Sequence, residues 1–343
     1  MTLFNSLFIS DLHLTDRVHD AYRWRVFEQC AELSRQHSVT ELFVLGDLTE
    51  AKDYHSSRLV NKIVDSFYFL RKTSRINEIY FLKGNHDGLD PEHPYFHFLR
   101  RMPWASVFVE PTWVDKGKET LLFLPHTRDP EKDWAGLEMG DASFIFLHGT
   151  VGGAVSETGQ KMEGISLDWF KGLRCTILAG DIHVPQKIGP VEYVGAPYPI
   201  RFGDVYQGRA LGYIDGKRVE FPLENLRKHT LRLEGPLVQS GKARWPGLRK
   251  GDQVTFVIVL SDSELGEWHE RKKWCMDFCA AEGAVLLNVK LERKATAAST
   301  KPSLAAVKAA KVRTPEETLS LYCATRKVEA PLAKLGKQLL AEE

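Results

Sequence analysis

The sequence predicts an α/β fold of β-sheets flanked by helices, followed by a small α+β domain and a helical C-terminal tail. Three observations support this prediction: short apolar runs recur along the chain, helical patterns lie between them, and polar residues that can bind metals follow them. The 343 residues, 43% hydrophobic and 27% charged, are typical of an ordinary globular protein with two domains and a tail.

The apolar runs are short, rich in β-forming residues and followed by polar or glycine-containing turns. They comprise residues 7–9, 42–45, 79–82, 121–124, 144–147 and 176–179. Runs of this kind are typical of strands that are buried on both faces of a layered sheet. Residues 22–36 and 58–72 lie between runs and have helical patterns. Loops at the carboxyl ends of such strands gather at one edge of the fold.

Five of these strands are followed by residues whose side chains can bind metals. The residues are Asp11, His13, Asp47, Asn85, His86, Asp87, His148, Asp181 and His183. Carboxylate, amide and imidazole groups bind Mn²⁺, Fe and Zn²⁺, and the oxygen ligands also suit Mg²⁺. One such residue after a strand is usually a turn or capping residue, whereas five such loops together indicate a metal site.

The spacing of these residues has a physical logic. In Asp-x-His at residues 11–13, the side chains lie two residues apart, so on an extended backbone both point the same way and can bind one ion. The same argument applies to residues 181–183. The two oxygens of Asp47 can bridge two ions about 3.5–4 Å apart, as in two-metal hydrolases. Sharp turns and close approach are permitted by glycines at positions 46, 84, 149 and 180.

The ordered series Asp-x-His, Gly-Asp, Gly-Asn-His-Asp, His and Gly-x-x-His resembles the calcineurin-like metallophosphoesterase superfamily over about residues 5–215. The HVPQ, YVGAP and FGD segments at residues 183–186, 193–197 and 202–204 look like the SbcD-type nuclease subunit of the double-strand-break repair complex. This resemblance implies a DNA exonuclease, with endonuclease activity left open, that hydrolyses phosphodiester bonds with a water activated by two metals.

The resemblance also implies a role for each matching residue. The implied ligands are Asp11, His13 and His183 for the first metal, Asp47 as the bridge, and Asn85, His148 and Asp181 for the second metal. His86 corresponds to the family's catalytic histidine, which stabilises charge or protonates the leaving oxygen. Asp87 would orient the loop. The expected cofactors are two divalent ions, Mn²⁺ in the first place and Mg²⁺ in the second.

Position 181 departs from the family pattern. The last motif of the family is usually Gly-His-x-His, and here Asp181 replaces the first histidine. An added carboxylate makes the site harder and favours Mn²⁺ or Mg²⁺ over Zn²⁺. Alternatively, Asp181 is too short to bind, a water fills its position and the second metal binds weakly.

Beyond residue 220 the pattern changes. Strands are expected at residues 225–234, 253–260 and 284–291, with a helix at residues 263–281 that is capped by Ser263 and ended by Gly283. Residues 221–294 would form the capping domain that the resemblance implies beside a nuclease core at residues 1–220. The basic residues proposed for DNA contact, or alternatively for a solvated surface, are Arg227, Lys228, Arg271, Lys272 and Lys273.

The cysteines are expected to be inert. Cys275 and Cys279 lie four residues apart on the predicted helix, with no further zinc ligands nearby, so they are expected to pack in the core.

Five cysteines without framework spacing are typical of a reducing compartment. With no signal peptide pattern and no long apolar run, a cytoplasmic location is expected, or the host cytoplasm for a viral protein.

Residues 295–313 form a predicted basic linker, and residues 314–343 form a predicted helical tail that begins with a Thr-Pro-x-Glu start signal. The resemblance implies that the tail docks an SbcC-like coiled-coil ATPase. The alternative is packing against the protein's own core.

An apolar stripe covers residues 59–70, and an aromatic cluster covers residues 95–99. Both correspond to regions that form the dimer in family relatives, so the resemblance implies a homodimer. The alternative is that the stripe packs in the core, as such stripes more often do. The net charge of +1 neither supports nor excludes DNA as a partner.

Two other functions stay open: hydrolysis of small phosphate esters by the same core, and a catalytically weak scaffold that binds DNA ends.

Overall fold

The computed structural model describes residues 5–90, 93–202, 204, 206–235 and 247–294. The predicted linker, the predicted tail and Cys323 lie outside the described residues. The described residues within 1–260 and 266–292 belong to one compact unit. In the described part of the chain, no helix combines the length and the apolar character needed to cross a membrane.

The first of two six-stranded sheets has the order β12-β11-β1-β2-β3-β4. Its strands are β1 (Ser6–Ile9), β2 (Glu41–Val44), β3 (Glu78–Leu82), β4 (Ala105–Phe108), β11 (Arg209–Ile214) and β12 (Lys217–Pro222). Strands β1 to β4 are parallel, whereas β11 is antiparallel to both β1 and β12. The carboxyl ends of β1, β2 and β3 therefore meet at one edge of this sheet.

The second sheet has the order β5-β6-β7-β8-β10-β9. Its strands are β5 (Thr112–Lys116), β6 (Glu119–Leu124), β7 (Phe144–His148), β8 (Thr176–Gly180), β9 (Gln186–Ile188) and β10 (Val191–Tyr193). Strands β6, β7, β8 and β10 are parallel, and β5 and β9 are antiparallel edge strands. All six predicted apolar runs thus form strands, and the central strands of both sheets are buried as predicted.

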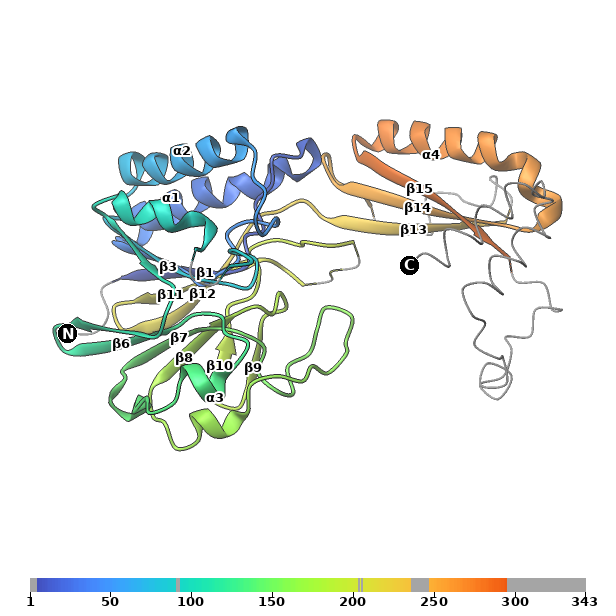
Figure 1. The fold of residues 1–343 in the computed structure, drawn as a ribbon. Helices are drawn as coiled ribbons and strands as arrows, with labels where there is room; N and C mark the ends of the chain where they lie inside the picture. The colour runs from blue at the N-terminus through green and yellow to red at the C-terminus, as the bar shows by residue number, and fades with distance from the viewer. Residues whose placement is uncertain (1–4, 91–92, 203, 205, 236–246, 295–343) are drawn as a thin grey trace, which may run out of the picture. The chain divides into compact units, whose positions relative to one another are not determined.

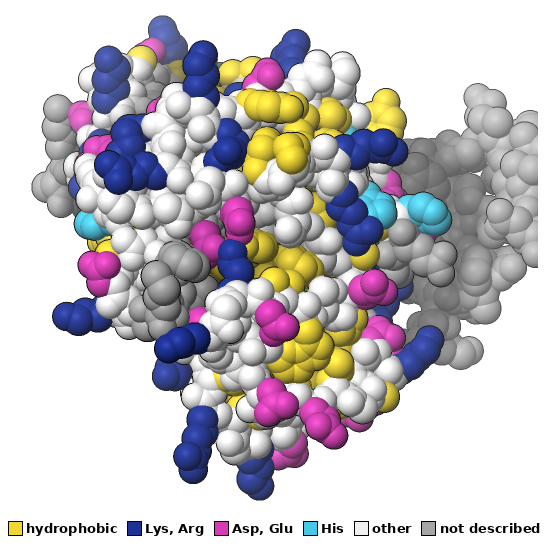
Figure 2. Space-filling view, turned by 90° about the vertical axis from the view of Figure 1, so that its left-hand side faces the viewer, with side chains coloured by type: hydrophobic (Ala, Val, Ile, Leu, Met, Phe, Trp, Pro, Cys, Tyr) yellow, Lys and Arg dark blue, Asp and Glu magenta, His cyan; other side chains and the backbone are white. Residues whose placement is uncertain are grey.

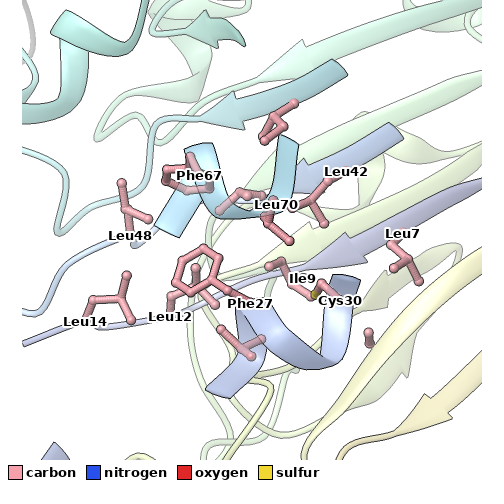
Figure 3. Packing of buried hydrophobic residues seen from close by; sticks show 14 of the residues in the cluster. Leu7, Ile9, Leu12, Leu14, Phe27, Cys30, Leu42, Leu48, Phe67 and Leu70 are labelled. Atoms are coloured by element: carbon pink, nitrogen blue, oxygen red, sulfur yellow. The ribbon is translucent and has the colours of Figure 1, made fainter. Parts of the chain in front are cut away.

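Helices α1 (Arg25–His37) and α2 (Ser57–Thr73) cover the outer face of the first sheet (Figure 1). Figure 3 shows Phe27 and Cys30 of α1 and Phe67 and Leu70 of α2 packed among leucines of the strands and strand-end loops. Aromatic side chains fill the space between the two sheets, where the rings of Phe8 and Phe43 stack at 4.8 Å. The core therefore has helices, sheet and sheet in successive layers.

Short helices complete the core. They are η1 (Val18–Trp24), η2 (Tyr95–Arg101), α3 (Pro130–Asp133), η3 (Met139–Asp141) and η4 (Leu167–Phe170). The prediction of one helix over residues 22–36 was wrong at its start, because residues 18–24 form a 3₁₀ helix before α1 begins. Helix α2 starts where Ser56 accepts a hydrogen bond from the Leu59 amide at 3.1 Å.

The apolar stripe of α2 is mainly core. Its buried side chains are Leu59, Ile63, Phe67 and Leu70. The aromatic cluster after β3 is also largely internal, since Phe96 and Leu99 are buried. Tyr68 and Phe69 of α2 are exposed, at 53% and 39%.

Three strands and one helix follow the two sheets. The sheet has the order β13-β14-β15, formed by β13 (Lys228–Glu234), β14 (Gln253–Leu260) and β15 (Val285–Arg293). Helix α4 (Trp268–Glu282) connects β14 to β15 and follows the 3₁₀ helix η7 (Asp262–Glu267). The predicted β-α-β unit is therefore present.

Two predicted boundaries in this domain were wrong. Helix α4 does not begin at Ser263, because residues 262–267 adopt the tighter 3₁₀ turn, and β13 begins at Lys228 rather than at residue 225. The predicted end is correct, since Gly283 adopts φ 67° after the last turn of α4. Cys275 and Cys279 are buried as predicted, and burial raises the pKa of Cys275 to about 12.

The charged side chains are mixed on the face of the molecule that Figure 2 shows. Figure 2 shows Lys and Arg interspersed with Asp and Glu on the face that corresponds to the left-hand side of Figure 1. This pattern agrees with the net charge of +1. Recognition of an anion on this face would therefore depend on local groups rather than on a large positive field.

Candidate metal centre

The predicted ligand residues lie at the carboxyl ends of strands from both sheets. The first sheet contributes Asp11, His13, Asp47 and the segment 85–87, and the second contributes His148, Asp181 and His183. Three compact groups form there, and within each group the ligand atoms lie within 4.8 Å of one another. The groups are Asp11, His13 and His183; His13, Asp47 and His86; and Asp11, Asp47 and His148. The fold thus brings distant segments to one site.

The backbone at this site is not extended. Positive φ angles occur at four non-glycine residues that were predicted as ligands: Asp11 at 55°, His13 at 43°, Asp47 at 55° and Asp181 at 95°. The argument that alternating side chains of an extended chain point the same way was therefore wrong, although the side chains do converge. Such conformations cost about 1–3 kcal/mol each and persist only where the surroundings enforce them.

Hydrogen bonds between neighbouring loops enforce these conformations. The Asp11 amide donates to the Gly46 carbonyl at 3.1 Å, and the His13 amide donates to the Asp47 carbonyl at 2.9 Å. Gly84 permits the third loop to approach, because a Cβ there would lie 2.2 Å from Asp47 Oδ1. The loops after β1, β2 and β3 are thus locked together by backbone contacts.

On one side of the centre, two histidines face each other. His13 Nε2 lies 3.2 Å from His183 Nε2 and 3.4 Å from Asp47 Oδ2. His183 Nδ1 is buried and has no hydrogen-bond partner among the described residues. Two imidazole nitrogens and a carboxylate that converge in this way suit a divalent cation.

On the other side, His148 Nε2 is the central atom. It lies 3.4 Å from Asp47 Oδ1, 3.2 Å from Asn85 Oδ1 and 3.9 Å from Asp181 Oδ1. The two oxygens of Asp47 therefore face His13 and His148, one each, which is the arrangement of a bridging carboxylate. Asp181 belongs to none of the three compact groups, and its other oxygen accepts a hydrogen bond from Thr150.

The electrostatics of the site also suit a cation. Burial raises the pKa of Asp11 to about 8, and burial together with the charge of Asp87 raises that of Asp47. Burial lowers the pKa of His13 to about 3, so this ring is neutral. Ionised carboxylates are costly in such surroundings unless a positive charge compensates them. A divalent ion would supply that charge, and neutral imidazole is the form that binds metals.

His86 lies beside these groups with its ring held in place. Its amide donates to Asp47 Oδ1 at 2.8 Å, and its Nδ1 lies 2.7 Å from the Glu50 carbonyl oxygen. The ring centroids of His13 and His86 are 4.7 Å apart. Because Nδ1 is engaged by a carbonyl, Nε2 is the nitrogen that remains for chemistry.

Asp87 orients the loops around it. Its carboxylate accepts hydrogen bonds from the backbone amides of Asp47, Leu48 and Gly84 at 2.7–2.9 Å. Three amide donors hold this side chain so that it cannot turn toward the metal centre. The role expected for Asp87, that of orienting the loop, agrees with this geometry.

Sequence reasoning missed Glu50 and Arg23. Glu50 Oε2 lies 3.1 Å from His13 Nδ1, a polar contact that lowers the pKa of Glu50 to about 2. The buried Arg23 guanidinium donates to the His13 carbonyl. Both contacts orient His13, as outer carboxylates and donors commonly do for metal-binding histidines. The position of Glu50, three residues after Asp47, could have indicated that it lies near the metal centre, whereas nothing in the sequence indicated this for Arg23.

The basic residues predicted for DNA contact are distributed differently. Arg271 is only 1% exposed, donates to Glu267 at 2.7 Å and to the Gly235 carbonyl at 2.9 Å, and is therefore not placed to contact DNA. This prediction is corrected, because α4 turns Arg271 inward. Lys228 donates to the Ile200 carbonyl at 2.7 Å.

The remaining basic residues are more accessible. Arg227 pairs with the buried Asp252 at 2.7 Å and is about a third exposed. Lys272 and Lys273 are exposed on α4. Of the five, these two lysines are the ones that solvent and a phosphate can reach freely.

Residues 4–185 match the calcineurin-like phosphoesterase family. The chain belongs to this family. The match covers the loops after β1, β2, β3, β7 and β8, which carry all the predicted ligand residues described above. The family and the buried clusters of His and Asp together indicate a hydrolase of phosphate esters that binds divalent metal.

The chain is also similar to exonuclease subunit 1 of Enterobacteria phage T4. The two are 22% identical over 236 residues, which cover 64% of this chain and 68% of the phage protein. The aligned length exceeds the 182 residues of the family match, so the similarity extends beyond the family region.

Proposed function

We propose that this phosphoesterase is a metal-dependent DNA nuclease, mainly an exonuclease, that acts in DNA end processing. The observation that supports the choice of substrate is the similarity to a phage exonuclease subunit over 64% of the chain. The proposal agrees with the FGD and YVGAP segments that follow the last motif.

In this proposal the centre holds two divalent ions, with Mn²⁺ preferred and Mg²⁺ second. Ligands of the first ion are Asp11, His13 and His183, ligands of the second are Asn85, His148 and Asp181, and Asp47 bridges them. Bound ions of this kind lower the pKa of a coordinated water and neutralise charge on the phosphate. Among the oxygens of Asp47, Asn85 and Asp181, that of Asp181 lies farthest from His148 Nε2, at 3.9 Å.

His86 would assist departure of the sugar oxygen. Its ring is fixed by the contact of Nδ1 with the Glu50 carbonyl, which leaves Nε2 to carry a proton to the leaving group. Asp87 and Glu50 would act as positioning residues, the first for the loops and the second for His13. General acid catalysis of this kind contributes about 10²–10⁴-fold.

The finer assignments of partners belong to the same proposal. Lys272 and Lys273 would contact DNA phosphates outside the metal centre, with a smaller part for Arg227 and Lys228. A coiled-coil ATPase resembling SbcC would bind the segment 314–343. Tyr68 and Phe69 on α2 offer exposed aromatic surface for a homodimer.

The test is digestion of end-labelled linear duplex DNA in the presence of Mn²⁺, comparing the wild type with His86→Ala. We expect the wild type to shorten the DNA from its ends and His86→Ala to lose most of that activity while it still binds metal. A His86→Ala variant that degrades DNA at the wild-type rate would remove His86 from the chemistry.

A second candidate function is hydrolysis of small phosphate esters, which the family membership by itself allows. Hydrolysis of bis-p-nitrophenyl phosphate in the same reactions separates the two. Cleavage of this compound together with inactivity on DNA would replace the nuclease by the small-ester function. A purified protein that Mn²⁺ activates on neither substrate would favour a scaffold.

A further inference from the structure

Two basic residues next to the metal centre are not used by the proposed mechanism. Lys83 follows β3 directly and precedes Gly84, and His126 lies two residues after the end of β6. They come from different sheets and are joined by a hydrogen bond of 2.9 Å from the His126 amide to the Lys83 carbonyl. Both residues thus lie at the edge of the fold where the metal ligands gather.

Both side chains carry polar atoms without protein partners. Lys83 is only 8% exposed, and its ammonium forms no hydrogen bond or ion pair with any described residue. His126 Nδ1 is buried and also lacks a hydrogen-bond partner within the described ranges. A buried polar atom without a partner, such as His126 Nδ1, is rare in folded proteins and often marks the place of a ligand.

Two carboxylates that act on Lys83 through their charge, Asp87 and Asp133, accept hydrogen bonds from other groups. Asp87 accepts three backbone amides, and Asp133 accepts a hydrogen bond from the Thr127 hydroxyl. Near His126, the negative charge of Asp181 opposes the positive charges of Lys83 and Lys52.

The position relative to the metal centre is defined by His148. The ring centroids of His126 and His148 are 6.2 Å apart, and His148 lies on the side of the centre that contains Asn85. His13 and His183 form the opposite side. An anion at Lys83 and His126 would thus lie beside the centre, next to the second metal position.

We propose that Lys83 and His126 bind a non-scissile phosphate of the DNA backbone, adjacent to the one that is cleaved. This inference rests on the proposed nuclease function. A lysine ammonium and an imidazole N–H are suitable donors to phosphate oxygens. Small phosphate esters have no second phosphate, so this subsite would favour polynucleotides over small esters at a metal centre that accepts both.

The test removes, in separate experiments, the protein side chain or the charge of the DNA phosphate that it is proposed to bind. The protein change is Lys83→Met or His126→Asn, and the DNA change is one neutral methylphosphonate linkage placed in turn at each position next to the cleaved bond. With Mn²⁺, we expect one methylphosphonate position to slow the wild type about tenfold. Lys83→Met should slow cleavage of unmodified DNA by about the same factor, and the modification should then add no further loss.

Control reactions separate binding from folding. Lys118→Met makes the same substitution at an exposed lysine before β6 and should behave as the wild type on every DNA. Lys83→Arg should restore most of the DNA cleavage. The DNA rate of Lys83→Met should fall about tenfold more than its rate on bis-p-nitrophenyl phosphate.

Three outcomes would overturn the subsite. In the first, the losses from Lys83→Met and from the methylphosphonate multiply at every position, so the two do not interact. In the second, Lys83→Met loses as much activity on bis-p-nitrophenyl phosphate as on DNA, which would place Lys83 on the scissile phosphate or in the fold. In the third, the wild type does not cleave DNA, which would remove the proposed function and the subsite together.

Discussion

Charged residues have opposite surroundings in two regions: the edge where the strand ends carry the predicted metal ligands, here called the metal edge, and the β13–β15 sheet with helix α4, here called the α+β region. At the metal edge, every predicted ligand lies at the carboxyl end of a strand, and positive backbone φ angles hold four of them in place. In the α+β region, Arg271 is buried while Lys272 and Lys273, its immediate neighbours, are exposed.

This difference shows that the position of a residue in the sequence predicts the surroundings of its side chain at a strand end better than on a surface helix. A residue that ends a buried parallel strand is carried to the sheet edge by the strand itself. A residue on a surface helix reaches the interior or the solvent depending on how the helix packs, and neighbouring positions differ by about 100° around the axis. Motifs are therefore more informative in the first region than runs of charge are in the second.

The largest expected effect comes from Asp47→Asn, which tests whether the metal edge behaves as one unit. An amide has a single oxygen and cannot bridge, so we expect metal stoichiometry to fall from two ions to one and hydrolysis to fall by about 10³-fold. Metal content after dialysis and Mn²⁺-dependent hydrolysis of bis-p-nitrophenyl phosphate measure this. Full occupancy by two ions would contradict the bridging role.

In the α+β region, the corresponding change is Arg271→Ala. It removes the hydrogen bonds to Glu267 and Gly235 from a buried position, so we expect a loss of about 2 kcal/mol in the free energy of unfolding. Urea denaturation provides the measurement. DNA affinity of the folded variant should stay at the wild-type value, and a weakened affinity without loss of stability would return Arg271 to the DNA surface.

Asp181→His tests whether the residue at position 181 binds metal, as the other predicted ligands of the metal edge are expected to do. Histidine restores the usual family residue and removes one negative charge, so we expect the affinity for Zn²⁺ relative to Mn²⁺ to rise about tenfold. Titrations of the metal-free protein with each ion measure the ratio. An unchanged ratio together with unchanged stoichiometry would mean that Asp181 does not bind metal.

The smallest effect is expected from Lys272→Ala and Lys273→Ala. Each removes an exposed charge, so stability should change little, whereas the slope of log affinity for DNA against log salt should fall by about 1 for each phosphate that the lysine neutralised. Lys217→Ala on β12, also an exposed lysine, is the matched control. Salt slopes identical to the wild type would assign both lysines to a solvated surface.

Much of the fold followed from the pattern of apolar residues. The runs at residues 42–45 and 144–147 form central strands because four consecutive buried side chains need a sheet that is covered on both faces. The starts of helices were less predictable, because a 3₁₀ turn and an α-helical turn can both form there. Residues 18–24 and 262–267 form 3₁₀ helices, although their sequences also suit the first turns of longer α-helices.

Sequence alone determined which residues can be ligands, because only Asp, Asn and His side chains repeated after strands supply that chemistry, and their order specified the family. Tertiary structure alone decided how they meet. The left-handed backbone at Asp11 and His13 depends on hydrogen bonds to the loop of Asp47, which is distant in the chain. The contacts of Glu50 and Arg23 with His13 arise for the same reason, since they join segments that no local sequence pattern places together. The same holds for His126 Nδ1, which has no hydrogen-bond partner among the described residues.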